Sequence, residues 1–384
     1  MVMISDRKMI WETVSKIAKQ ELAPRAAEVD RTGNYPRDGL RKLAEAGFLG
    51  MTVPEAMGGG GADSLSFVMA TEAIAKGCAS TASAFVAHAF VAGALAAAGS
   101  DEQKSRFLPA MTAGYRLGAF AGTETVSGAN PFAIATKAVS DGDDFVVNGT
   151  KAFITSSEEA EVYLVLLRTD QARSPADISA LIMEKGTPGF SFGRKEDHMG
   201  LRGSSDGELI FQDCRVPRAN LLGAENGYYL AILPQIQGLA MLGAAGISLG
   251  IAQAAADAAI SHAKTREVAG QSIGQYQGVQ YLVAEMSTAL AEARALTYSA
   301  AEQLDGNGSQ PPSPLPLFMA KLSATETAID VTHKALQVHG GTGYSRELPL
   351  ERYYRDARGG TLHFIPSEML KGMLGRMLMG MPPF

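Results

Sequence analysis

Residues 117–157 read LGAFAGTETVSGANPFAIATKAVSDGDDFVVNGTKAFITSS, and this stretch decides what kind of protein the chain forms. It begins with an apolar run at residues 119–121 and then breaks into small and hydroxylated residues at 122–127. Residues of this kind bring backbone N–H groups close to a flat or anionic ligand. We therefore expect the stretch to begin with a ligand cradle.

The second half of the stretch has the pattern of a strand, a turn and a strand. Residues 140–144 are rich in turn formers, and residues 145–147 are rich in β formers. Asn148-Gly149 is a strong hairpin signal, and residues 151–155 then resume the strand. An ordinary surface meander has the same local pattern, so the pattern alone does not identify a ligand site.

Length and composition are those of a globular protein with several domains. A chain of 384 residues exceeds the usual size of a single core, so two or three domains are expected. The net charge of -6 does not indicate the excess of Lys and Arg that nucleic-acid-binding proteins carry, which argues against a nucleic-acid partner. The two cysteines, Cys78 and Cys214, fit a reducing compartment better than a disulfide framework, which favours a cytoplasmic location.

Neither a targeting segment nor a membrane span is predicted. Residues 81–99 are apolar enough to raise the question, but they are mostly alanine with His88 among them. Such a composition favours a buried helix over a membrane-spanning one.

The chain divides into three parts by its periodicity. Residues 1–117 are predicted to be helical, residues 118–224 to form strands, and residues 225–384 to form helices again. Long helices are expected at 64–98, 229–264, 279–304 and 317–338, and a shorter one at 367–378. Antiparallel packing of the C-terminal helices would give a four-helix bundle.

Three motifs carry a resemblance to a known family. They are TETVSGAN at 123–130, FIT at 153–155 and MGLRGSSDGELIFQDCRVPRANLLG at 199–223. With them the chain resembles the acyl-CoA dehydrogenase flavoproteins over essentially all of its length. The resemblance implies an N-terminal α domain, a middle β-barrel-like domain, a C-terminal four-helix bundle and bound FAD.

The resemblance also implies which residues bind FAD. Phe153 would lie against the flavin, the Thr155 hydroxyl would reach its N5 atom, and Glu368 would lie near the adenine end. The remaining expected contacts within one subunit are Phe120, Ala121, Gly122, Thr123, Gly128, Ala129 and Ile154. No metal site is expected.

A neighbouring subunit is implied by a second group of residues. Arg266, Gln277, Gln337, Gly340 and Gly341 match the elements with which one subunit of the family grips the FAD of its neighbour. A homotetramer built as a dimer of dimers would follow. The family's aromatic residue in the first of these elements is Ala269 here, so some packing on the neighbouring cofactor is lost.

The usual catalytic base is missing. Family members take the substrate α-proton with a Glu, and in RDARGGTLHFIPSEM, residues 355–369, its position is held by Phe364. A minority branch uses a Glu at the position of Ala240, followed by an Arg where this chain has Met241. Loss of a positioned general base typically slows a reaction by about 10²- to 10⁴-fold.

Three interpretations remain open. Glu368 or His363 could serve as a relocated base. A flavin site without its base could instead run a reduction, an elimination or oxygen activation. A flavoprotein subunit without activity is the third.

We predict α,β-dehydrogenation of an acyl thioester with hydride transfer to flavin N5, only narrowly ahead of variant flavin chemistry. The thioester would be an acyl-CoA or an acyl carrier protein conjugate, and electrons would leave to an electron-transferring flavoprotein. Ala129, Met241, His363 and Phe364 are the expected substrate contacts. Because Ala129 and Met241 depart from the family, a changed acyl or carrier pocket is also expected.

Overall fold

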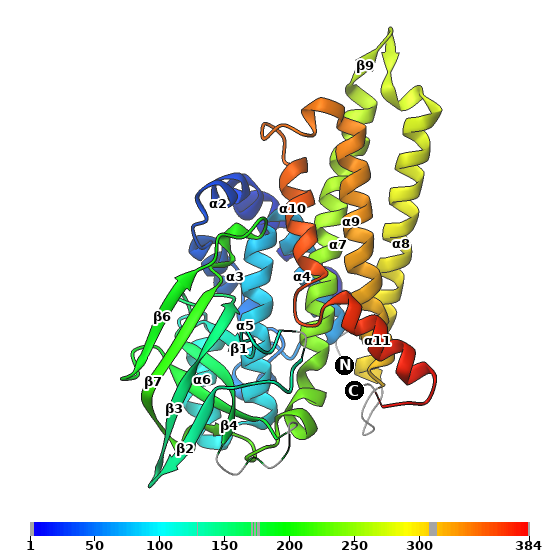
Figure 1. Cartoon of the computed structure of the whole chain (residues 1–384). Helices are drawn as coiled ribbons and strands as arrows, with labels where there is room; N and C mark the ends of the chain where they lie inside the picture. Colours follow the sequence, from blue (N-terminus) through cyan, green and yellow to red (C-terminus); the bar gives the residue numbers. More distant parts are fainter. Residues whose placement is uncertain are drawn as a thin grey trace.

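The computed structural model describes residues 4–128, 130–169, 172, 174, 177–306 and 313–382 (Figure 1). Its N-terminal part is helical, as predicted. The helices there are α1 (Ile4–Ile17), α2 (Ala26–Thr32), α3 (Arg37–Glu45), α4 (Ser64–Gly77), α5 (Ala79–Ala98) and α6 (Asp101–Thr112). A π-helical turn at Ala18–Leu22 and a 3₁₀ turn at Ala23–Arg25 join α1 to α2.

The single helix expected over residues 64–98 is two helices, so that prediction was wrong. Cys78 lies between α4 and α5 in an extended conformation, with φ -154° and ψ 110°. Asp63 caps the start of α4 by accepting a hydrogen bond from the Ser66 N–H at 2.8 Å. Gly77 lies so close to the Ala18 carbonyl that a Cβ there would be 2.7 Å from it. This close approach accompanies the end of the helix at a position that apolar periodicity does not mark.

The middle part forms the sheet. The described residues give eight strands in the order β6-β7-β3-β2-β4-β5-β8, with β1 pairing in parallel with β4. The strands are β1 (Gly118–Ala121), β2 (Lys137–Asp141), β3 (Asp144–Ile154), β4 (Val162–Thr169), β5 (Ser179–Glu184), β6 (Phe190–Lys195), β7 (Gly207–Pro217) and β8 (Leu221–Leu222). Figure 1 shows this sheet beside α5, away from the long C-terminal helices.

The hairpin expected at Asn148-Gly149 does not form. Strand β3 runs through both residues, and its pairing with β7 shifts register between Val147 and Gly149. The site is thus a β-bulge, where an extra residue bends a strand without reversing it. A Cβ on Gly149 would lie 2.5 Å from the Thr136 hydroxyl, so close packing accounts for the glycine. The turn falls instead within the segment predicted at 140–144, between β2 and β3.

The C-terminal part is a helical bundle. It begins with a π-helical segment, Tyr228–Ile232, and continues as α7 (Leu233–Thr265), α8 (Gln277–Gly306), α9 (Leu315–His339), α10 (Leu350–Gly360) and α11 (Ser367–Leu378). Helix α9 packs against α7, α8 and α10, and α7 also packs on α4 and α5. A short hairpin of β9 (Glu267–Val268) and β10 (Gln271–Ser272) projects from one end of the bundle (Figure 1). The predicted fold class is confirmed.

Among the residues that the structure describes, two helical spans are long and apolar enough to cross a membrane. They are Ala79–Ala98 and Tyr228–Thr265, whose most apolar windows are 78% and 89% buried inside the structure. Core helices of soluble proteins pass the same test of length and composition, and both spans are covered by the rest of the chain.

Candidate active site

A cavity of about 830 Å³ lies between the helical parts and the sheet. Its walls come from α5, from β1 and the loop after it, from the end of β3, from α7 and from the chain around α10. Ten of the residues predicted to contact cofactor or substrate lie on these walls: Phe120, Gly122, Thr123, Gly128, Phe153, Ile154, Thr155, Met241, His363 and Phe364. Cavities of several hundred cubic ångströms are typical of cofactor and ligand sites.

Other predicted residues lie elsewhere. Ala121 alternates with Phe120 along β1 and is buried beneath the cavity wall. Glu368 is exposed on α11 and does not line the cavity. Ala129 lies outside the described residues.

The residues predicted to reach a neighbouring subunit gather at one end of the bundle. Arg266 follows α7, Gln277 begins α8, and Gln337, Gly340 and Gly341 lie at the end of α9. The ends of α7 and α9 are adjacent, because the rings of His262 and His339 stack with centroids 4.2 Å apart. None of these residues lines the cavity of its own chain.

A buried ion pair holds the two parts of the cradle together. The Lys151 ammonium on β3 donates to Glu124 Oε1 at 2.7 Å, and its side chain is 0% exposed. Glu124 also accepts hydrogen bonds from the backbone N–H groups of Ala135 and Thr136 and from the Thr136 hydroxyl. Burial lowers the pKa of Lys151 to about 8, whereas the Lys151 charge and these hydrogen bonds outweigh burial and lower the pKa of Glu124. Sequence reasoning missed this pair because its partners are 27 positions apart.

Two aromatic residues on the cavity wall have exposed side chains and a positive φ angle. The Phe153 side chain is 52% exposed and that of Phe364 is 39% exposed. Both residues have φ 57°, in the left-handed region that costs a non-glycine residue about 1–3 kcal/mol. A flat ligand bound in the cavity would cover both exposed rings and would account for the strained backbone that presents them. The residues present therefore fit a flavin.

The two positions where a catalytic Glu is expected both face the cavity, and neither carries an acid. Ala240 and Phe364 line it, as does Met241. Phe364 belongs to an aromatic wall in which its ring lies 6.1 Å from Phe90, and the Phe90 ring lies 4.8 Å from Phe120. Among the described residues of the lining, Asp206 is the one carboxylate.

Asp206 and His198 form a pair that sequence reasoning missed. His198 Nδ1 lies 3.0 Å from Asp206 Oδ2, and the Ser204 hydroxyl donates to the same oxygen. The hydrogen bond to Asp206 raises the pKa of His198. Burial favours a raised pKa for Asp206, but the hydrogen bonds from His198, Ser204 and Thr155 outweigh it and lower that pKa. The available signal was two titratable residues at the ends of the glycine-rich segment HMGLRGSSD.

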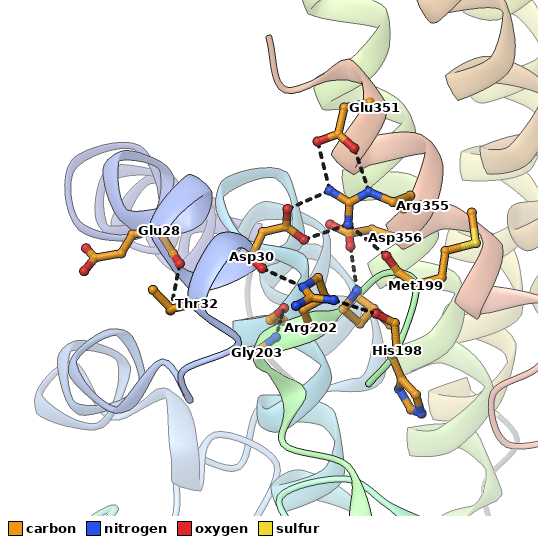
Figure 2. Close-up of polar contacts among 12 residues, drawn as sticks. Glu28, Asp30, Thr32, His198, Met199, Arg202, Gly203, Glu351, Arg355 and Asp356 are labelled. Atoms are coloured by element: carbon orange, nitrogen blue, oxygen red, sulfur yellow. Dashed lines mark hydrogen bonds and ion pairs between the residues drawn. The ribbon is translucent and has the colours of Figure 1, made fainter. Parts of the chain in front are cut away.

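The loop that carries His198 is fixed on the helical domains by the network in Figure 2. Arg355 on α10 pairs with Asp30 on α2 at 2.6 Å and donates to the Met199 carbonyl at 2.9 Å. The Asp356 carboxylate accepts a hydrogen bond from the Leu201 N–H at 2.6 Å. Figure 2 shows the His198 imidazole pointing away from these contacts. The loop is thus anchored by contacts that do not involve the His198 imidazole, which pairs with Asp206 instead.

Comparison with known proteins identifies the family. Models of the N-terminal, middle and C-terminal domains of acyl-CoA dehydrogenase match residues 5–115, 119–214 and 239–379. The short-chain specific acyl-CoA dehydrogenase of Rattus norvegicus mitochondria is 41% identical over 91% of this chain and 84% of its own length. An acryloyl-CoA reductase (NADH) of Anaerotignum propionicum is 39% identical over 97% of this chain and 94% of its own length.

A solved structure agrees over its full length. Butyryl-CoA dehydrogenase from Megasphaera elsdenii superposes with a TM-score of 0.93 at 32% identity, covering 99% of both chains. Three matching domain models, two close relatives and one full-length structural match all point the same way. The chain belongs to the acyl-CoA dehydrogenase family.

Proposed function

We propose that this chain is an FAD-dependent oxidoreductase that acts on the Cα–Cβ bond of an acyl thioester. The observation that carries the proposal is one cavity whose lining includes Phe153 and Thr155 of the cradle together with Phe364 and the aromatic residues around it. When bound, FAD supplies a carrier that accepts or returns a hydride. The protein's own residues hold both partners, orient them and exclude water.

The cofactor is proposed to lie along the β-side of the cavity. Phe120, Gly122, Thr123 and Gly128 would border it, Phe153 and Ile154 would flank the ring system, and Thr155 would offer its hydroxyl to N5. Arg266, Gln277, Gln337, Gly340 and Gly341 would grip the cofactor of a second subunit, which supports a homotetramer built as a dimer of dimers. Their position at the end of the bundle, outside their own cavity, supports a role in another subunit.

The acyl group is proposed to lie against the helical side of the cavity. Phe90 and Phe364 give this side an apolar surface suited to a hydrocarbon chain. Met241 on α7 borders the same space. The thioester would be an acyl-CoA or an acyl carrier protein conjugate in cytoplasmic fatty acid metabolism. Electrons would leave to an electron-transferring flavoprotein.

The direction of the reaction depends on the missing base. Dehydrogenation must remove the α-proton, and neither Phe364 nor Ala240 can accept it. Reduction of an enoyl thioester is therefore a second candidate function, and the acryloyl-CoA reductase among the relatives supports it. Elimination or monooxygenation remains open as variant chemistry, and a flavoprotein subunit without activity is the alternative from a different class.

A single substitution tests this proposal. Phe364→Glu places a carboxylate at the position that carries the catalytic Glu in most of the family. It should raise the rate of dehydrogenation of simple acyl-CoAs by about 10²-fold or more. Phe364→Gln is the matched control, since it has a similar shape without basicity. A gain with Glu but not with Gln supports the acyl thioester site. No gain with Glu, in a protein that still holds FAD, would count against it.

A further inference from the structure

We propose that His198 and Asp206 form a proton-binding pair beside the flavin and couple reduction of the flavin to uptake of one extra proton. This inference rests on the flavin site proposed above. It does not depend on which thioester is the substrate or on the direction of the reaction.

The geometry begins with a buried carboxylate at the cavity. The Asp206 side chain is 4% exposed and lines the cavity wall. Its Oδ2 atom is paired with His198, whereas its Oδ1 atom has no hydrogen-bond partner among the described residues. A buried carboxylate oxygen without a partner is costly, so such an atom calls for an explanation. Its place beside the proposed flavin suggests a role that a purely structural pair would not need.

Thr155 lies next to this carboxylate in the fold. Strand β3 pairs with β7 at Ile154 and Gly207, so the residues that follow Ile154 and precede Gly207 are neighbours. Both Thr155 and Asp206 line the cavity. Because Thr155 is proposed above to face the flavin, the carboxylate lies on the flavin side of the cavity and can respond to the charge of the cofactor.

His198 lies beside the same part of the cradle. Its ring is nearly parallel to that of Phe153, with centroids 6.2 Å apart and an interplanar angle of 22°. The charged groups that act on it are Asp206, Glu196 and Asp197, all of which favour the protonated imidazole. On the other side lies His363, which also interacts with Asp206, and whose pKa is lowered by burial and by the charges of His198 and Lys321. His198 is partly exposed, so protons can reach it.

Proton uptake follows from charge. Hydride transfer moves two electrons and one hydrogen nucleus from the donor to the flavin, which then carries one additional negative charge. A negative charge nearby raises the pKa of a histidine or a carboxyl group. The His198–Asp206 pair would therefore bind one proton from water when the flavin is reduced and release it when the electrons leave.

The test is the pH dependence of the midpoint potential of the bound flavin, measured with dithionite and a reference dye and without any thioester. One extra proton per two electrons adds a tenfold change in the equilibrium constant per pH unit, which is about 30 mV. The wild-type chain should show this additional slope over part of the range from acid to neutral pH. His198→Asn and Asp206→Asn should lose it, and His333→Asn on the exposed side of α9 should keep it.

A second measurement removes any dependence on how well the variants fold. The imidazole signal of His198 in the wild-type protein can be titrated by NMR with the flavin oxidised and then reduced. We expect a higher His198 pKa in the reduced protein. An unchanged His198 pKa, or a potential whose slope is the same in the wild type and both variants, would overturn the inference. A wild-type chain that holds no flavin would overturn the proposed function as well.

Discussion

Replacement of Lys151 by Met is expected to destabilise the chain and loosen the flavin. The substitution leaves the Glu124 carboxylate buried without its charge partner, which lies 2.7 Å away in the wild type. Breaking a buried pair from one side typically costs about 3–5 kcal/mol. Glu124 keeps hydrogen bonds to the Ala135 N–H at 2.7 Å and the Thr136 N–H at 3.0 Å, so we expect the lower end, about 3 kcal/mol.

This cost can be converted into a melting temperature. The entropy of unfolding is about 2.1 cal/mol/K per residue, so a chain of 384 residues that unfolds cooperatively should melt about 4 °C lower. Differential scanning calorimetry of the flavin-loaded protein measures the shift, and flavin fluorescence measures release of the cofactor. Release should be faster in the variant, because Lys151 also donates to the Gly122 carbonyl of the cradle at 3.3 Å.

The dependence on pH gives a sharper criterion. In the wild type the pKa of Glu124 is lowered, so the stability that it contributes is present above its unfolded pKa and is lost as the pH falls. In Lys151→Met, burial is opposed only by the remaining hydrogen bonds and no longer by the Lys151 charge. The pKa of Glu124 is therefore higher than in the wild type, and the variant recovers as the carboxyl group is protonated. The difference between the two proteins should therefore be largest at neutral pH and should shrink towards pH 4.

Two control variants complete the experiment. Lys137→Met removes an exposed lysine from the neighbouring strand β2 and should melt as the wild type does. Lys151→Met combined with Glu124→Gln removes both charges and should recover more than half of the loss. The expected shift for Lys151→Met is about 4 °C, so a melting temperature within about 1 °C of the wild type would refute the role of the pair. A double variant that melts no higher than the single variant would refute it as well.

Two further predictions concern stability. Burial lowers the pKa of His88 to about 4, so the free energy of unfolding should fall by about 3 kcal/mol between pH 6.5 and pH 4 and stay level above pH 6.5. His88→Gln should lose this part of the acid sensitivity in urea denaturation curves, and an unchanged dependence would exclude His88 as its source. Gly250→Ala should destabilise the crossing of α7 and α4 by at least about 1–3 kcal/mol, because its Cβ would lie 2.3 Å from the Glu72 carbonyl oxygen. Gly372→Ala on α11, where a Cβ meets no atom within 4 Å, is the control and should be neutral or slightly stabilising in the same melts.

Local pattern was enough to place most elements of the fold. The helix predicted at 367–378 coincides with α11. The helix predicted at 229–264 matches the π-helical segment Tyr228–Ile232 together with α7, and the one predicted at 317–338 matches α9, each within a few residues. Apolar periodicity over such lengths records the face that packs on the core. The errors occurred where long-range packing decides, as at Gly149, where the pairing of β3 with β7 shifts register and Thr136 packs close to the glycine.

The candidate site divides in the same way. Motif resemblance located Phe153, Thr155 and Phe364, and the fold brings all three to one cavity. The Lys151–Glu124 and His198–Asp206 pairs were missed, because an ion pair depends on the register of strands and on loop geometry. Glu368 was considered as a base from its spacing to Phe364, but α11 leaves it away from the cavity.

The most direct measurement is an anaerobic titration of the flavin-loaded protein, followed by visible absorbance. Short, medium and branched acyl-CoAs are added to the oxidised protein, and the matching enoyl-CoAs are added after reduction. We expect hydride exchange in at least one direction: bleaching by an acyl-CoA with release of an enoyl thioester, or reoxidation of the reduced flavin by an enoyl-CoA. A protein that holds FAD but whose absorbance responds to no thioester in either state would contradict the assignment as an acyl thioester oxidoreductase.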